Sequence, residues 1–122
     1  MKFTLDSAGA VNIIQGYDSG QITINGKEHH QSLILMPDRI DTWGPEDFAS
    51  LSVDDFTRLA ELEVEMVILG TGSRHHFPHP SLVRTLTLKQ VGLEAMDTAA
   101  ACRTYNILVG EGRRVAAALL MI

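Results

Sequence analysis

The polar side chains that could do chemistry gather in the last third of the chain, between residues 97 and 113. They supply carboxylates, guanidinium groups, hydroxyls and an amide around a run of small residues, 99–101, that favours a helix. Placing so many polar groups near a core is costly unless they are hydrogen-bonded or used. A carboxylate, a guanidinium and helix amides that meet at one strand edge could bind a small anionic ligand. The candidates are Asp97, Thr98, Arg103, Thr104, Asn106, Glu111 and Arg113.

A second candidate is the turn Gly70-Thr71-Gly72, which follows the apolar run Val64–Leu69. Glycines let a ligand approach the backbone, and ligands of open α/β sheets lie at the carboxyl ends of strands. His75 stands where a dinucleotide fingerprint needs a third glycine, and no lysine follows to make a phosphate loop. The turn therefore predicts no nucleotide site. It is either a bare turn or a place where exposed amides bind a small anion or a carbonyl group.

Each candidate also has a structural interpretation. Asp97 and Thr98 can cap the helix that follows them, and Glu111 can pair with Arg113 or Arg103 in a structural network. Cys102 falls in the middle of the predicted helix, where an inert buried thiol is favoured over a nucleophile. No complete catalytic constellation can be drawn, so we expect no catalytic residue and no cofactor.

The histidines do not predict a metal site. His75, His76 and His79 lie close together, but Pro78 and Pro80 prevent a helical face on which they could converge. The favoured interpretation is a solvated loop of positive character.

The elements that must position these residues begin with strands. The run Val11–Gly16 is β-branched, and residues 21–24 and 27–31 flank Asn25-Gly26, which is a strong hairpin signal. A further strand is predicted over 32–36, where Pro37-Asp38 breaks it. Ser52 and Asp55 indicate a helix to about residue 62.

Strands and helices then alternate to the end of the chain. We expect a strand over 64–69, a helix capped by Ser81 and stopped by Gly92, a strand over 93–96, a helix to about residue 109 and a closing strand over 114–122. Such alternation is typical of βαβ crossovers around a central, largely parallel sheet. The prediction is one compact α/β domain over residues 1–122.

Composition narrows the class of protein. The formal charge is −5, which argues against a nucleic-acid partner or an anionic membrane surface. The first residues meet an acid before any apolar run, and no segment approaches the roughly 20 apolar residues of a spanning helix. One cysteine permits no intrachain disulfide, which suits a reducing compartment. We therefore expect a cytoplasmic protein without membrane insertion.

The order of several motifs resembles a known family. It is the family of small proteins of unknown function whose mitochondrial member is a complex I assembly factor. The resemblance rests on residues 68–72, Arg74, Phe77-Pro78, residues 92–94, 96–98, 101–108 and 111–113, and on the early strands through Trp43. It implies a three-layer α/β fold, with a central mixed sheet flanked by helices and an extra layer from the N-terminal β-hairpin.

The resemblance also bears on function. It implies action by binding other proteins, carries over no cofactor, and leaves the activity of most bacterial members unestablished. The leading hypothesis is a non-catalytic binding or assembly-support protein that uses the face around Gly70–Gly72 and Asp97–Arg113. The rival is a ligand-binding protein or enzyme with its cleft at the Gly70-Thr71-Gly72 turn, and a third hypothesis makes the polar motif purely structural. Exposed strand edges also suggest a homodimer.

Overall fold

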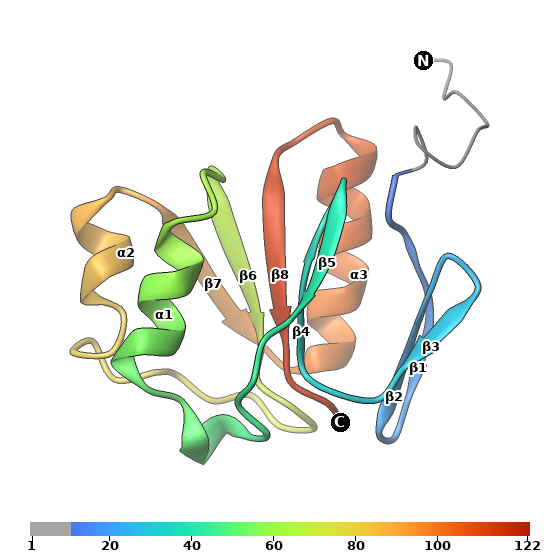
Figure 1. Cartoon of the computed structure of the whole chain (residues 1–122), viewed down its shortest axis with the longest axis horizontal. Coiled ribbons are helices and arrows are strands. Elements are labelled where there is room, and N and C mark those ends of the chain that lie inside the picture. Colours follow the sequence, from blue (N-terminus) through green and yellow to red (C-terminus); the bar gives the residue numbers. More distant parts are fainter. Residues whose placement is uncertain (1–10) are drawn as a thin grey trace.

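The computed structural model describes residues 11–122, which form two β-sheets and three α-helices (Figure 1). The smaller sheet has the order β1-β2-β3, from Ile14–Asp18, Gln21–Ile24 and Lys27–His29. The larger sheet has the order β5-β4-β8-β6-β7, from Arg39–Thr42, Leu33–Met36, Val115–Leu119, Met66–Gly70 and Gly92–Met96. The start of the predicted domain, and the first residues that argued against a signal peptide, lie outside the described residues.

The predicted Asn25-Gly26 hairpin is confirmed. Both residues adopt positive φ, 49° and 84°, and Ile24 pairs with Lys27 across the turn. The front of the chain is nevertheless a three-stranded sheet of its own, because β1 pairs with β2 on the side away from β3. The strand predicted over Val11–Gly16 is observed as β1, shifted to Ile14–Asp18, and it extends the expected hairpin layer to three strands.

The central sheet is mixed, as predicted, but it is not largely parallel. β6 is parallel to β7 and β8, whereas β4 is antiparallel to β5 and β8. One of the two antiparallel pairs arises at Pro37-Asp38, where the sequence predicted only the end of a strand. These two residues form a tight turn, and Met36 pairs with Arg39 in the unpredicted strand β5.

Side chains of the central strands alternate between two cores. Val67 and Leu69 pack on the side of α1 and α2, while Ile68 packs on the side of α3 and the small sheet. Figure 1 shows the same division, with α1 and α2 on one side and α3 with β1–β3 on the other. The central strand β8 supplies small residues, Ala116–Ala118, to both cores, which lets the helices approach the sheet closely.

The helices begin where local chemistry favours it. Helix α1, Val53–Ala60, has the predicted capping box between Ser52 and Asp55. Helix α3, Thr98–Gly110, begins after Asp97, whose carboxylate accepts a hydrogen bond from Ala100 N. Among residues 11–122, no helix combines the length and apolar character needed to cross a membrane.

The second helix differs from its prediction. Helix α2 is only Arg84–Leu88, and Ser81 does not cap it, because Val83 occupies the cap position without a side-chain hydrogen bond. Gly92 does not stop this helix but begins β7. The left-handed conformation after α2 is adopted by Gln90, with φ of 58°.

Candidate functional site

The turn after β6 is tightly enclosed. A Cβ atom on Gly70 would lie 2.9 Å from Thr98 Oγ1 and 3.0 Å from Leu119 Cδ2, so only glycine fits between β8 and the start of α3. Gly72 adopts φ of 102°, a conformation that side chains rarely permit. The two glycines are thus required by packing and backbone geometry, before any ligand is considered.

Thr98 joins three elements at this turn. Its hydroxyl donates to Leu120 O at 2.7 Å and accepts from Gly72 N at 2.8 Å, and its own N–H donates to Gly72 O at 2.8 Å. The side chain is fully buried. Thr98 therefore connects the ends of β6 and β8 to the first turn of α3. Its own buried polar atoms are hydrogen-bonded, which avoids the free-energy cost of burying them without partners.

Thr71 fixes the loop that follows. Its N–H donates to Met96 O, and its hydroxyl donates to Arg74 O at 2.6 Å and accepts from His76 N at 3.2 Å. The amides of Thr71 and Gly72 are both engaged within the molecule. These two N–H groups are therefore not free to bind an anion, as one interpretation of the turn's sequence expected. A ligand here would have to be bound by the side chains around the turn.

Besides Thr98, three candidates on α3 contact the rest of the protein through their side chains. The Asn106 side chain accepts from Ile14 N at 3.0 Å and donates to Ile14 O at 2.7 Å, which pairs the helix with β1 as a further strand would. Arg103 Nη1 donates to Tyr17 Oη, also in β1, and Thr104 Oγ1 donates to Met96 Sδ. Arg103 and Asn106 thus hold the small sheet against α3.

Glu111 and Arg113 lie far from the turn. Helix α3 has 13 residues, and about 1.5 Å of rise per residue puts roughly 20 Å between its ends. Arg113 pairs there with Glu65 at 2.6 Å, and Glu111 caps the helix through its backbone. In Figure 1 their loop lies at the opposite end of the molecule from the turn after β6. The structure therefore divides the predicted cluster, bringing Asp97 and Thr98 to Gly70–Gly72 and leaving these two away from it.

A pocket of about 360 Å³ lies beside Gly72. The side chains that give this pocket its character are not among the predicted site residues. His76 stacks on Phe48 with ring centroids 4.7 Å apart, and Arg74 and Asp47 contribute opposite charges to the lining. Phe48 begins a short 3-10 helix, η2 (Phe48–Ser50), and Asp47 is its N-cap; only the fold brings this helix next to β6.

The loop beyond this pocket presents an exposed aromatic ring. Phe77 is 78% exposed, although Phe56 is completely buried. A second hollow of about 400 Å³ is lined by apolar side chains next to the edge strand β7: Phe77, Pro78, Pro80, Val83, Leu93 and Ala95, with Glu94. In the sequence, Phe77 stands between His76 and Pro78, and this apolar ring in a polar, proline-containing loop was the signal that could have indicated an exposed apolar surface.

Cys102 is a poor nucleophile in this fold. The thiol is buried within α3, and desolvation raises its pKa to about 12, against a smaller opposing influence of Arg103. At neutral pH it is protonated. Tyr105, also buried, has its pKa raised by desolvation first and by Asp38 second, and its hydroxyl donates to Asn12 O. Both side chains are parts of the core.

Nothing within residues 11–122 groups three or more histidine, cysteine, aspartate or glutamate side chains in a position to hold a metal ion. His75, His76 and His79 do not converge, and their contacts differ. His75 packs against Phe77, His76 stacks on Phe48, and His79 hydrogen-bonds with Ser81.

These features define a small mixed α/β protein in which part of the polar motif holds strand ends to a helix. The chain belongs to the family described as "Protein of unknown function (DUF498/DUF598)", whose model matches residues 14–120. The resemblance inferred from the sequence motifs is thereby confirmed.

Individual relatives agree with this assignment. The chain is 31% identical over 115 residues to "NADH dehydrogenase [ubiquinone] 1 alpha subcomplex assembly factor 3" of Danio rerio, covering 93% of this chain and 66% of that protein. It is 37% identical over 115 residues to an uncharacterised protein of Rhodobacter capsulatus, covering 93% and 86%. The crystal structure of a Bordetella parapertussis protein superposes with a TM-score of 0.88 at 38% identity, covering 94% of this chain and 99% of that one.

The curated assembly factors are longer than this chain. It spans 59% of the Bos taurus protein of the same name, to which it is 30% identical, and 66% of the Danio rerio protein. The family includes complex I assembly factors at modest identity, together with bacterial members that have no stated activity.

Proposed function

We propose that this chain is a non-catalytic binding protein that supports the assembly of other proteins. The observation that carries the proposal is its membership of a family with assembly factors among its members, one of them 31% identical over 93% of this chain. Since the chain spans 66% of that relative, the assembly role of the longer protein is extended to it as part of the proposal.

The chemistry of the site supports binding over catalysis. The hydroxyls of Thr71 and Thr98 and the amides of the turn are engaged in internal hydrogen bonds. The one thiol has a pKa of about 12, because it is buried. Groups already hydrogen-bonded in this way position a loop, whereas a general base or nucleophile must have its reactive atom available to a substrate.

We place the partner-binding face at the Gly70–Gly72 end of the molecule, on the loop that Thr71 anchors. Phe77 is the proposed anchor, because exposed aromatic side chains beside a hollow are typical of the residues that dominate protein interfaces. The free edge of β7 runs along the same hollow. Glu111 and Arg113 are not part of this face, since they lie at the other end of α3.

The proposal can be tested by capture of the tagged protein from its native cells at endogenous level, with chemical cross-linking and mass spectrometry. Wild type is compared with Phe77→Ala and with Ile107→Ala. Ile107 is a matched control, because it is 61% exposed but lies on α3, on the opposite side of the central sheet. Neither substitution should lower the thermal stability appreciably, since both side chains are exposed.

We expect a defined set of proteins to be enriched with wild type and with Ile107→Ala, and lost with Phe77→Ala. Respiratory-complex subunits or their assembly machinery in that set would support the assembly role. Capture that is unchanged in Phe77→Ala would overturn the assignment of the face, and recovery of the protein alone would overturn the assembly role.

A second candidate function is the binding of a small anionic molecule at the turn. The observation in its favour is the pocket of about 360 Å³ with the Arg74 guanidinium and the stacked Phe48 and His76 rings in its lining. A panel of organic anions, nucleotides and acyl derivatives should then raise the melting temperature of wild type but not of Arg74→Gln. A flat response for both proteins would dismiss this function.

Three further expectations belong to the proposal. They are the three-layer arrangement of a single domain over residues 1–122, a cytoplasmic location, and a homodimer formed through the outer strands. Sedimentation equilibrium of the purified protein tests the dimer.

A further inference from the structure

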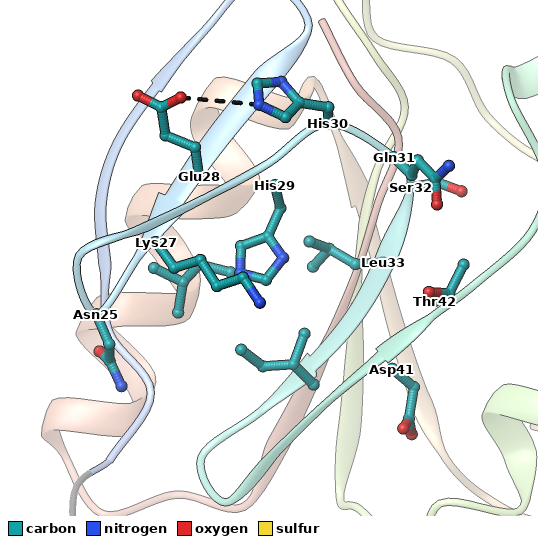
Figure 2. A pocket seen from close by; sticks show the side chains of 12 residues that line it. Asn25, Lys27, Glu28, His29, His30, Gln31, Ser32, Leu33, Asp41 and Thr42 are labelled. Atoms are coloured by element: carbon teal, nitrogen blue, oxygen red, sulfur yellow. Dashed lines mark ion pairs between the residues drawn. The ribbon is translucent and has the colours of Figure 1, made fainter. Parts of the chain in front are cut away.

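A further hollow lies away from the turn, between the two sheets. It has a volume of about 750 Å³ and lies between β3 and the β4–β5 hairpin (Figure 2). The apolar part of its lining is Ile24, Leu33 and Ile40. This volume falls within the range of small-molecule pockets, about 300–1,000 Å³. We refer to this hollow as the inter-sheet cleft.

Residues 27–30 all contribute to the lining of the cleft, and their successive side chains point in opposite directions. Figure 2 shows Lys27 and His29 pointing into the cleft, with their nitrogen-bearing ends next to one another. Glu28 and His30 point to the other side, where they form an ion pair of 3.7 Å. Because side chains alternate in direction along a strand, the two basic side chains of β3, Lys27 and His29, point away from its one acid, Glu28.

No acid within residues 11–122 forms an ion pair with Lys27. Asp41, which reaches the lining from β5, is bound by Arg39 at 2.7 Å. The pKa of His29 is lowered, first by burial and then by the charges of Lys27 and His30. The cleft thus holds an ammonium group and an imidazole side by side over apolar side chains. The two carboxylates of its lining, Glu28 and Asp41, are paired with His30 and Arg39.

We propose that the inter-sheet cleft binds an organic anion with an apolar body. The carboxylate or phosphate of the ligand lies between Lys27 Nζ and the His29 ring, and its apolar part lies on Ile24, Leu33 and Ile40. A charge-assisted hydrogen bond from each basic group is stronger than one between neutral groups. This inference is independent of the proposed partner-binding face, which lies on another loop.

The arrangement couples ligand binding to a proton. An anion beside His29 offsets the influences that lower its pKa, so the pKa rises in the complex and binding strengthens as the pH falls. The charged groups around the ring are Lys27 and Glu28 on its own strand, His30, which follows that strand and pairs with Glu28, and the Asp41–Arg39 pair on β5.

The test uses octanoate and octyl phosphate as probes of the wild-type protein, followed by NMR of the His29 ring and of the Leu33 and Ile40 methyl groups. Octan-1-ol, which has the same apolar chain without charge, and inorganic phosphate, which has charge without the chain, are the controls. We expect both amphipathic anions to raise the pKa of His29 and to shift the methyl signals. Whichever of the two binds more tightly identifies the head group.

Variants assign the contacts. Lys27→Gln should weaken binding about tenfold, as expected for the loss of one charge-assisted hydrogen bond. His29→Gln should retain binding but lose its increase between about pH 7.5 and about pH 6. The matched control is Lys89→Gln, since Lys89 is also exposed but ends α2 on the other side of the central sheet.

Either of two results would overturn the proposal. One is equal shifts with octanol and octanoate, which would mean apolar contact alone. The other is an unchanged His29 pKa with both anions up to about 10 mM, a concentration that detects dissociation constants in the millimolar range. Circular dichroism of each variant establishes that it is folded, so that a loss of binding can be assigned to the side chain.

Discussion

The turn after β6 and the inter-sheet cleft are both rich in polar groups, but they differ in where those groups find their partners. At the turn, Thr98 and Thr71 direct their hydroxyls and amides to the ends of β6, β7 and β8. In the cleft, Lys27 and His29 face apolar side chains, and no acid among residues 11–122 forms an ion pair with Lys27. A dense polar motif in a sequence can therefore be a part of the molecule whose polar groups are mostly hydrogen-bonded internally, with few left to bind a ligand.

The largest effect is expected at Thr98. Thr98→Val preserves the shape of the side chain but leaves Gly72 N–H and Leu120 C=O without their partner, at about 1–3 kcal/mol for each buried group. Urea unfolding should therefore show a large loss in the free energy of unfolding. Thr98→Ser, which retains the hydroxyl, should lose only about 1 kcal/mol with the methyl group. A valine variant as stable as wild type would mean that the turn is not held by this side chain.

A smaller effect is expected at Asn106. Asn106→Ala removes both hydrogen bonds to the Ile14 backbone from a half-buried position, which should cost about 1–3 kcal/mol. Hydrogen exchange should report faster exchange at Ile14 and in β1–β3, because the small sheet loses a tie to α3. Asn106→Asp keeps the acceptor for Ile14 N and is expected to be intermediate. Uniform protection across all variants would contradict this role.

The cleft should respond to pH with a modest change in stability. Because the pKa of His29 is lowered in the folded protein from 6.5, the unfolded chain binds the proton more readily, and stability falls as the pH drops below that value. Lys27→Met removes one cause of the lowered pKa and should reduce this loss without destabilising the protein at neutral pH. NMR titration of His29 and urea unfolding at several pH values measure both. A His29 pKa that is identical in the variant would show that Lys27 does not act on the ring.

The smallest effect is expected at the far end of α3. The Arg113 and Glu65 side chains are 43% and 48% exposed, so their ion pair should contribute less than about 1 kcal/mol. Arg113→Ala should therefore unfold almost as wild type does, and added salt should remove the remaining difference. A loss in the free energy of unfolding as large as that of Thr98→Val would contradict this prediction and would mean that Arg113 is essential to the fold. Glu65→Gln is the matching control for the same pair.

Local signals were sufficient for several elements. Asn25-Gly26 predicted a hairpin, and Ser52 with Asp55 predicted the start of α1, because these residues act on the backbone next to them. Asp97 likewise predicted the start of α3. The motif order from Gly70 to Arg113 was sufficient to indicate the family, which the match over residues 14–120 confirms.

Other features depended on contacts between distant segments. Pro37-Asp38 was interpreted as the end of a strand, but the pairing of Met36 with Arg39 makes it a hairpin turn. The start of α2 had no capping side chain to mark it, since Val83 occupies that position. The closeness of Asp97 and Arg113 in the sequence suggested one site. In the structure they lie at opposite ends of helix α3, which keeps them apart.

The sequence by itself determined the class of fold and those helix starts and turns that depend on adjacent residues. It also supplied small residues, glycine or alanine, at positions where a larger side chain would not fit. The tertiary structure alone decided which polar groups are used inside the molecule and which face a cleft. The physical reason is that a hydrogen bond such as that between Thr98 and Leu120 joins residues 22 positions apart, and that between Asn106 and Ile14 joins residues 92 apart. Whether a polar side chain is satisfied depends on those distant partners, and only the fold brings them within reach.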